Sequence, residues 1–377
     1  AIDDYGKALE IKPDDAEAYN NRANAKGILG ELYTSAGKRE EAIDSLKDAI
    51  DDYGKALEIK PDDAEAYNNR ANAKGILGEL YTSAGKREEA IDSLKDAIDD
   101  YGKALEIKPD DAEAYNNRAI AKQNLGKLYA SEGKGEAIDS LKGAIDDYDK
   151  ALEIKPDDAE AYNNRANAKQ ILGKLYTSAG KREEAIDSLK DAIDDYDKAL
   201  ELNPNYAEAY NNRANAKKAL GELYVSIGKK EEAISSLKGA IDDCNEALKL
   251  NPNLAEAYNN RAIAKQNLGK LYASEGKGEE AIDSLKGAID DYDKALEIKP
   301  DFAEAYNNRA IAKQNLGKLY ASVGKGEEAI KSFNSAYLDL KELLHIYKES
   351  QGFWGMLEIY PRLIDLGVKA KNRDYQE

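Results

Sequence analysis

The chain has 377 residues with 25 Tyr but only three Phe, one Trp, one Met, one Cys and one His, which indicates that a short segment is copied many times. With 55 Lys and Arg against 73 Asp and Glu, the formal net charge of -18 disfavours nucleic acid as a partner, because cations that neutralise phosphates supply most of that affinity. The single Cys and the single His exclude a disulfide framework and a cysteine-rich zinc site, and they leave little for metal or triad chemistry.

The hydropathy and the first residues of the chain lead to expectations about membranes and about the location of the protein. No apolar stretch approaches the roughly 18 residues that a membrane span needs, so we expect no membrane partner. The chain opens at Ala1, without a starting Met and without a signal-like segment. We therefore expect a fragment, from which any targeting peptide would be missing, and a cytoplasmic location.

One motif, AEAYNNRA, recurs at steps of 48, 48, 47, 48, 48 and 48 residues, and the short step reflects one missing Glu. Seven copies therefore fill residues 16–350, preceded by a partial copy (1–15, the second half of a second helix) and followed by a divergent segment (351–377). We number the copies one to seven and name each column of equivalent positions by its residue in copy one. The copies begin at Ala16, Ala64, Ala112, Ala159, Ala207, Ala255 and Ala303.

Each copy predicts a first helix that begins just after a proline. Asp14 is the expected N-cap, with Glu17 closing a capping box, and Asn205 with Glu208 repeats the arrangement. Helical composition continues to Ala36, where Gly37 and Lys38 supply a C-terminal glycine and a turn.

A second helix is predicted to start near Arg39 and to end before Pro61, because proline restricts the residue that precedes it. Val, Ile and Thr nowhere alternate with polar residues, so we expect no sheet. The sequence predicts an all-α solenoid.

The residues AEAYNNRANAK, LG, EEAI and YGKALEIKPDD resemble the tetratricopeptide repeat, which pairs two antiparallel helices over about 34 residues. The resemblance covers nearly the whole chain and implies a right-handed superhelical solenoid with helices longer than usual. We interpret the 14 extra residues per copy as one added heptad in each helix, because seven residues rotate a helix face by only about 20°. The alternative is that Gly30 ends the first helix early and leaves a loop.

Small and large apolar residues are predicted to form the core stripes, from Tyr19 to Tyr33 on the first helix and from Ala42 to Leu57 on the second. Arg22 and Lys26 lie within the first apolar sector, where a cation needs a partner. Asp52, at the edge of the second stripe, is the expected partner of Arg22 in every copy.

The other face of the first helix carries the columns that vary most, those of Asn24, Gly27, Ile28 and Glu31, together with the constant Asn20 column. The resemblance implies that this face lines a concave groove and contacts ligands. Because Asn both donates and accepts hydrogen bonds, such a groove suits an extended or helical peptide. The expected partner-binding residues are Asn20, Asn24, Glu31, Asn68, Asn72, Asn116, Ile120, Lys127, Asn163, Asn167, Lys174, Asn211, Asn215, Asn259, Ile263, Asn307 and Ile311.

Neutral drift on a solvated face is the alternative explanation of this variation. Drift would also scatter substitutions over the outer face, yet the outer Asp51 column is mostly fixed, which favours function. The family's clamp for a terminal carboxylate is not carried over, because the matching columns hold mainly Glu and Asn. Alternating Glu and Lys in the Glu31 column indicates a partner of mixed charge.

No catalytic or cofactor-binding constellation is found, so we interpret the chain as a non-enzyme. Cys244 occupies the Tyr53 column and is expected to be a small core residue. His345 has no second ligand for a metal site. The Asp51–Asp52 pairs lack the loop spacing of a calcium site.

The segment from Ser350 is apolar and is interrupted by Pro361. We expect it to cap the last copy, as solenoids require, with a docking patch as the alternative.

Two functions remain open. The first is a scaffold that binds a peptide or protein segment in the groove. The second is a self-assembling solenoid that forms head-to-tail homo-oligomers, because near-identical copies expose complementary end faces. An enzymatic role would require a domain outside this fragment.

Overall fold

The structure, a computed structural model, describes residues 1–349, 359, 361–363, 365 and 366. The all-α prediction is confirmed, since this part of the chain holds helices and no strand. The helices are α1 (Ile2–Ile11), α2 (Ala16–Ser35), α3 (Arg39–Ile59), α4 (Ala64–Ser83), α5 (Arg87–Ile107), α6 (Ala112–Ser131), α7 (Glu136–Ile154), α8 (Ala159–Ser178), α9 (Arg182–Leu202), α10 (Ala207–Ser226), α11 (Lys230–Leu250), α12 (Ala255–Ser274), α13 (Gly278–Ile298), α14 (Ala303–Ser322) and α15 (Gly326–Glu349).

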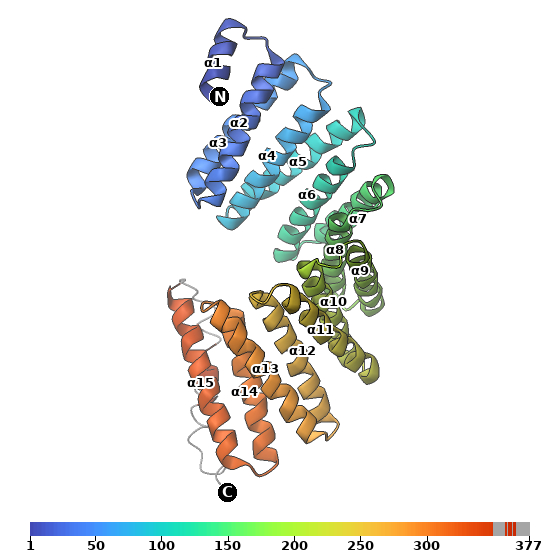
Figure 1. Ribbon diagram of the computed structural model, residues 1–377, viewed down its shortest axis with the longest axis vertical. Coiled ribbons are helices and arrows are strands. Elements are labelled where there is room, and N and C mark those ends of the chain that lie inside the picture. Colours follow the sequence, from blue (N-terminus) through green and yellow to red (C-terminus); the bar gives the residue numbers. More distant parts are fainter. Residues whose placement is uncertain (350–358, 360, 364, 367–377) are drawn as a thin grey trace. The chain divides into compact units, whose positions relative to one another are not determined.

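The helices group into two compact units, residues 1–202 and 203–377. Unit 1 holds α1 to α9 and unit 2 holds α10 to α15. Within each unit, the first helix of a copy packs against the second helix of the same copy, and that second helix packs against the first helix of the next copy (Figure 1). Each unit is therefore a stack of antiparallel helix pairs.

The turn between the two helices of a copy depends on a glycine. After α2, the Lys38 N–H donates to the Tyr33 carbonyl at 2.9 Å and the Gly37 N–H donates to the Thr34 carbonyl at 3.0 Å. This is the Schellman arrangement, which needs a left-handed residue, and Gly37 has a φ of 71°. The predicted C-terminal glycine is confirmed, and it recurs in every later copy.

The predicted N-cap of the first helix is wrong by one residue. The helix begins at Ala16, and the side chain of Asp15 rather than Asp14 accepts from the Ala18 N–H at 3.2 Å. Asp14 lies in the turn that follows Pro13, one residue too early to reach that N–H. In unit 2 the N-cap of α10 is Tyr206, which makes no side-chain cap, so the arrangement expected at Asn205 and Glu208 is also wrong.

Gly30 lies within a continuous α2, so the first helix carries its extra heptad without a loop. A Cβ atom at this position would lie 2.8 Å from Leu46 Cγ and 3.4 Å from the Ala42 carbonyl oxygen. The glycine therefore lets α2 and α3 approach closely.

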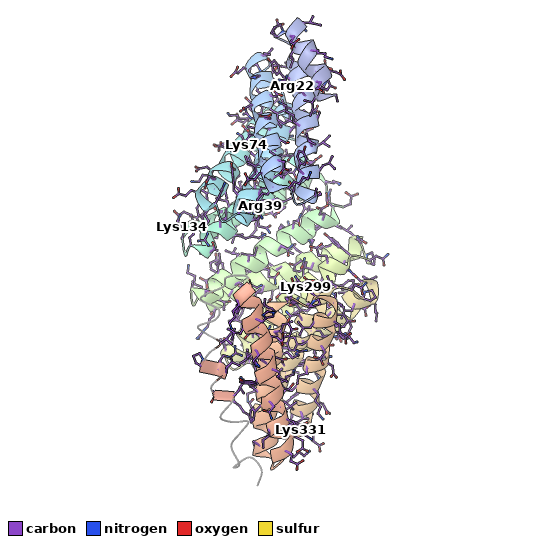
Figure 2. All side chains as sticks on the ribbon, turned by 90° about the vertical axis from the view of Figure 1, so that its left-hand side faces the viewer. Arg22, Arg39, Lys74, Lys134, Lys299 and Lys331 are labelled. Atoms are coloured by element: carbon purple, nitrogen blue, oxygen red, sulfur yellow. The ribbon has the colours of Figure 1, made fainter. Side chains whose placement is uncertain are left out.

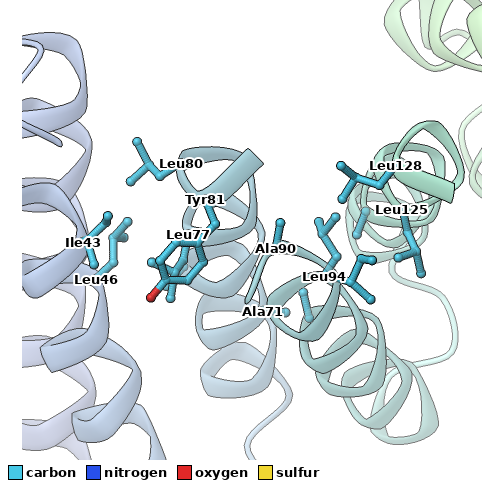
Figure 3. Close-up of a cluster of buried hydrophobic side chains, with 14 of the residues drawn as sticks. Ile43, Leu46, Ala71, Leu77, Leu80, Tyr81, Ala90, Leu94, Leu125 and Leu128 are labelled. Carbon is cyan, nitrogen blue, oxygen red and sulfur yellow. The ribbon is translucent and has the colours of Figure 1, made fainter. Parts of the chain in front are cut away.

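Buried side chains from neighbouring copies form one continuous core in unit 1. Figure 3 shows Leu46 of α3 beside Leu77 and Tyr81 of α4, with Leu94 of α5 next to Leu125 of α6. The second helices carry the predicted apolar stripe, in which Ala42, Leu46, Ala49, Tyr53, Ala56 and Leu57 are all buried. Burial of this stripe supplies most of the stabilisation of each pair.

A buried carboxylate joins the two helices of every copy. Asp52, only 2% exposed, accepts from both the Nε and Nη2 atoms of Arg22, at 2.7 and 2.6 Å, and from Lys26 Nζ at 2.7 Å. The Arg–Asp pairing predicted from the sequence is confirmed, with Lys as a second donor. Arg22 and Lys74, labelled in Figure 2, belong to the triplets of copies one and two. The equivalent carboxylates are Asp100, Asp147, Asp195, Asp243, Asp291 and Asp339.

Replacing Asp52 with Asn should lower the free energy of unfolding by about 3 kcal/mol near neutral pH, because Arg22 and Lys26 lose their buried counter-charge. Burial alone would raise the pKa of the Asp52 carboxyl, but the bonds from Arg22 and Lys26 outweigh it and hold that pKa below its ordinary value. Such a group stabilises the fold above its unfolded pKa, about 3.9, and this contribution is lost as the pH falls through the folded pKa. The difference in free energy of unfolding between the wild type and Asp52→Asn should therefore become smaller below about pH 4.

Urea unfolding followed by circular dichroism measures the loss, and hydrogen exchange should locate it in α2 and α3. Asp51→Asn is the control, because its exposed side chain should change stability by no more than about 0.5 kcal/mol. Equal losses in the two variants would contradict the assigned role of Asp52.

Gly30 and Gly27 offer a matched pair within α2. Gly30→Ala should destabilise the fold by about 1–3 kcal/mol, because the added Cβ overlaps Leu46. Gly27→Ala should instead stabilise it by up to about 1 kcal/mol, because a Cβ there meets no atom within 4 Å and alanine favours the helix. Thermal unfolding of both variants provides the comparison, and shifts in the same direction would refute the close approach at Gly30.

Candidate functional site

Two pockets open on the face of the first helices that carries the Asn20, Asn24, Gly27, Ile28 and Glu31 columns, which we call the groove face. One, of 330 Å³, is lined by α2 and α4, with Tyr53 at its wall. The other, of 220 Å³, is lined by α4 and α6, with Tyr101 at its wall. Both pockets lie in unit 1 and share Asn72 and Ile76.

Glycines create the room for these pockets. Gly27 and Gly75 line them, and a Cβ at either position would meet no atom within 4 Å. Other copies carry Gln in the same column, at Gln123, Gln170 and Gln266, and those side chains are buried. Glycine in this column therefore leaves open space beside the first helix, whereas glutamine places a buried side chain there.

The Tyr53 column explains part of the variation on the groove face. The hydroxyls of Tyr53 and Tyr101 donate to Asn24 and Asn72, and the Tyr196 hydroxyl has two acceptors within reach of its single proton, Asn167 Oδ1 at 2.6 Å and Gln170 Oε1 at 3.0 Å. Where Ile replaces the Asn, at Ile120 and Ile263, the hydroxyl donates to Gln instead, from Tyr148 to Gln123 and from Tyr292 to Gln266, both at 3.2 Å. When Ile removes the acceptor from the Asn24 column, Gln in the Gly27 column therefore accepts from the tyrosine hydroxyl in its place.

Sequence reasoning missed this exchange, although a signal was present. Ile occurs in the Asn24 column only in copies whose Gly27 column holds Gln, namely Ile120 with Gln123, Ile263 with Gln266, and Ile311 with Gln314, although in the last of these copies Leu340 replaces the tyrosine. In copy five, Asn215 has no such donor in its column, because Cys244 replaces the tyrosine.

The Asn20 column behaves differently, because four of its carbonyl oxygens lack a donor among the described residues. The Oδ1 atoms of Asn20, Asn68, Asn116 and Asn259 are buried and accept no hydrogen bond from any described residue. Asn211 Oδ1 accepts from Asn260 at 3.0 Å, and Asn163 is buried. Asn307 Oδ1 accepts from Nη1 of Arg362, a residue beyond α15, at 2.6 Å.

A third pocket, of 420 Å³, surrounds one of these oxygens. It lies between the first turns of α4 and α6 and is lined by Asn68, Asn72, Asp111 and Glu113. The pocket is thus lined by one residue with a buried acceptor, by carboxylates, and by Lys108, which pairs with Asp111.

The Glu31 column lies exposed along the groove face, at Glu31, Lys127 and Lys174 among others. Some of its charges are tied to the next copy, since the Asn124 amide donates to Glu79 at 2.9 Å and the Asn267 amide donates to Glu222 at 2.8 Å. Desolvation lowers the pKa of Lys127, although the nearby Glu79 opposes the shift.

No group of three or more His, Cys, Asp or Glu suited to a metal ion occurs in the described part of the chain. Cys244 is fully buried, as predicted, and burial raises the pKa of its thiol to about 12, so the thiolate is not available near neutral pH.

The predicted cap (351–377) lies mostly outside the described residues. Of those described, Ile359 and Leu366 are buried in one cluster with Phe333 and Leu340 of α15.

Comparison with known proteins identifies the repeat. A family model described as TPR repeat matches residues 1–27, 44–75, 78–126, 139–172, 188–221 and 284–317, more than half of the chain. The chain belongs to the tetratricopeptide repeat (TPR) family. A search of curated proteins finds no match.

Solved TPR structures resemble the chain only distantly. A TPR protein from Parabacteroides merdae ATCC 43184 is 21% identical, with a TM-score of 0.41 over 86% of this chain and 98% of that one. YrrB is 21% identical, with a TM-score of 0.38 over 68% of this chain and 97% of its own. MamA is 28% identical, with a TM-score of 0.31 over 58% and 95%. The family assignment therefore depends on the repeat itself.

TPR chains generally act as non-enzymatic scaffolds for protein interaction. None of the described helices is both long and apolar enough to cross a membrane.

Proposed function

We propose that this TPR chain is a scaffold that binds a peptide or protein segment along the groove face of its first helices. The observation that supports the proposal is the row of buried Oδ1 atoms without donors at Asn20, Asn68 and Asn116, in three consecutive copies. A buried acceptor without a donor costs about 1–3 kcal/mol. A partner that supplies N–H groups would remove this cost once per copy.

Asn307 illustrates the type of contact. Its carbonyl oxygen occupies the same column, and it accepts from the guanidinium of Arg362, which comes from another segment. Backbone N–H groups or Arg side chains of a bound segment are donors of the same kind.

The pockets and charges of unit 1 narrow the kind of partner. Gly27 and Gly75 leave room for side chains beside the apolar Ile76, while Glu31 and Glu79 are acidic. Lys127 and Lys174 make the Glu31 column basic in copies three and four. A segment of mixed charge, basic toward copy one and acidic toward copy four, fits this order, whereas the net charge of -18 disfavours nucleic acid.

Substituting Asn20, Asn68 and Asn116 with Leu should weaken peptide binding at least about ten-fold, because the acceptors that meet the partner are lost. The same change should leave stability unaltered or raise it, because near-isosteric apolar groups replace buried acceptors without donors. The probe is a phage library of random peptides selected on the whole wild-type chain, with the affinity of the selected peptides measured by fluorescence anisotropy.

The control replaces the exposed Asp51, Asp99 and Asp146 with Asn on the second helices of the same copies, and it should retain binding. Two results would reject the proposal: failure to select any peptide on the wild type, or equal affinity of the selected peptides for the Leu variant.

End-to-end assembly is the second proposal, supported by the near identity of the copies, which makes their end faces complementary. Leu32 is 62% exposed, whereas its equivalent Leu80, covered by the preceding copy, is 8% exposed. A second copy of the chain packed there would bury Leu32 in the same way. Sedimentation velocity should then show a mass that rises with concentration and falls back to the monomer in Leu32→Lys. A concentration-independent monomer would exclude assembly.

A further inference from the structure

One polar group on the groove face of unit 2 lacks a partner that its equivalents have. The amide nitrogen of Asn315, in α14, is buried and donates to no described residue. A buried donor without an acceptor is unfavourable and points to a ligand that supplies one.

Two other copies show which acceptor is missing. In copies three and six, the equivalent amides of Asn124 and Asn267 donate to carboxylates of the preceding copy, Glu79 at 2.9 Å and Glu222 at 2.8 Å. Each donor lies 45 residues after its acceptor. The same separation leads from Asn315 back to Lys270, so the carboxylate of this position is replaced by an ammonium group.

The replacement also changes the charge around the amide. Lys270 and Lys318 occupy the Glu31 column in copies six and seven, and both are exposed. Desolvation lowers the pKa of Lys270, and the carboxylate of Glu222 in copy five opposes this shift. Asn315 therefore has an ammonium group at the position where Asn267 has the carboxylate of Glu222.

We infer that Asn315, Lys270 and Lys318 bind a carboxylate of the partner, an Asp or Glu side chain of an acidic segment. The carboxylate takes the place that Glu79 and Glu222 hold in the other copies: it accepts from the Asn315 amide and is neutralised by the two lysines. A carboxylate has two oxygens that together accept several hydrogen bonds, so one carboxylate satisfies all three groups. Hydrogen bonds to an ionised acceptor are also roughly twice as strong as neutral ones. The exposed and unbranched side chain of Lys270 can turn aside to admit it.

This inference rests on the proposed function, because it names one subsite of the same face. The subsite lies in the Ile28 and Glu31 columns. The family's clamp for a terminal carboxylate uses other columns, which hold mainly Glu and Asn in this chain. Paired lysines alone do not create the site, since Lys127 is followed in the next copy by Ile171, which offers no amide.

Lys270→Glu provides the sharpest test, because it gives Asn315 a carboxylate acceptor from the preceding copy, as Glu222 does for Asn267. The introduced carboxylate should accept from Asn315 and raise the midpoint of thermal unfolding by about 2 °C. Lys127→Glu is the charge-matched control, and it should give no such rise because Ile171 cannot donate. No rise in Lys270→Glu, or an equal rise in the control, would overturn the geometry; this arm requires no peptide.

The second arm uses the random-peptide library on three whole chains: wild type, Lys270→Glu and Lys127→Glu. Peptides from the wild type and the control should be enriched in Asp and Glu over those from Lys270→Glu. Replacing the enriched acid with its amide should weaken binding to the wild type about ten-fold. Asn315→Leu should cause a similar loss without unfolding the chain.

The outcomes separate this inference from the proposed function. Peptides that bind the wild type and lose affinity in the Asn20, Asn68 and Asn116 variant, but show no acidic preference that depends on Lys270, would overturn the carboxylate subsite and leave the proposed function standing. A library that yields no peptide would overturn both. An acidic preference lost equally in Lys127→Glu would show that net charge alone is responsible, which also overturns the subsite.

Discussion

A carboxylate buried between two helices organises each copy of this TPR chain. Asp52 binds the guanidinium of Arg22 through both oxygens and Lys26 through one, so the first helix is fixed in height and rotation against the second. Apolar packing alone would tolerate rotation of these helices, because small residues dominate their stripes. The paired charges remove that freedom, and they thereby decide which columns face the core and which form the groove face.

Much of this architecture follows from the sequence, because it depends on patterns within one copy. Three features are local in this sense: the period, the helix ends marked by Gly37 and Pro61, and the pairing of Arg22 with Asp52. Contacts between copies were not predicted: the Asn124 amide reaches Glu79 in the neighbouring copy, across 45 residues, and a helical wheel does not contain that neighbour. The misplaced N-cap at Asp14 shows a further limit, since one residue of turn geometry decides which Asp reaches the helix.

The varied columns on the groove face divide into two groups once these contacts are known. The Asn24 and Gly27 columns vary together to keep an acceptor for the tyrosine hydroxyl, which is a requirement internal to the fold. Buried groups of four members of the Asn20 column and of Asn315 instead have no partner among the described residues. Variation by itself, the signal available in the sequence, does not separate the two groups; the hydrogen bonds do.

The tyrosine contact also restricts the order in which one copy can change into another. A copy with Asn and Gly, such as copy one, loses the only acceptor of Tyr53 if Asn24 becomes Ile first. Copy four holds both acceptors, Asn167 and Gln170, and the Tyr196 hydroxyl can donate to either. It therefore represents a permissive intermediate: gain of Gln before loss of Asn lets a duplicated unit diverge from a pocketed surface to a filled one without ever leaving the hydroxyl unsatisfied.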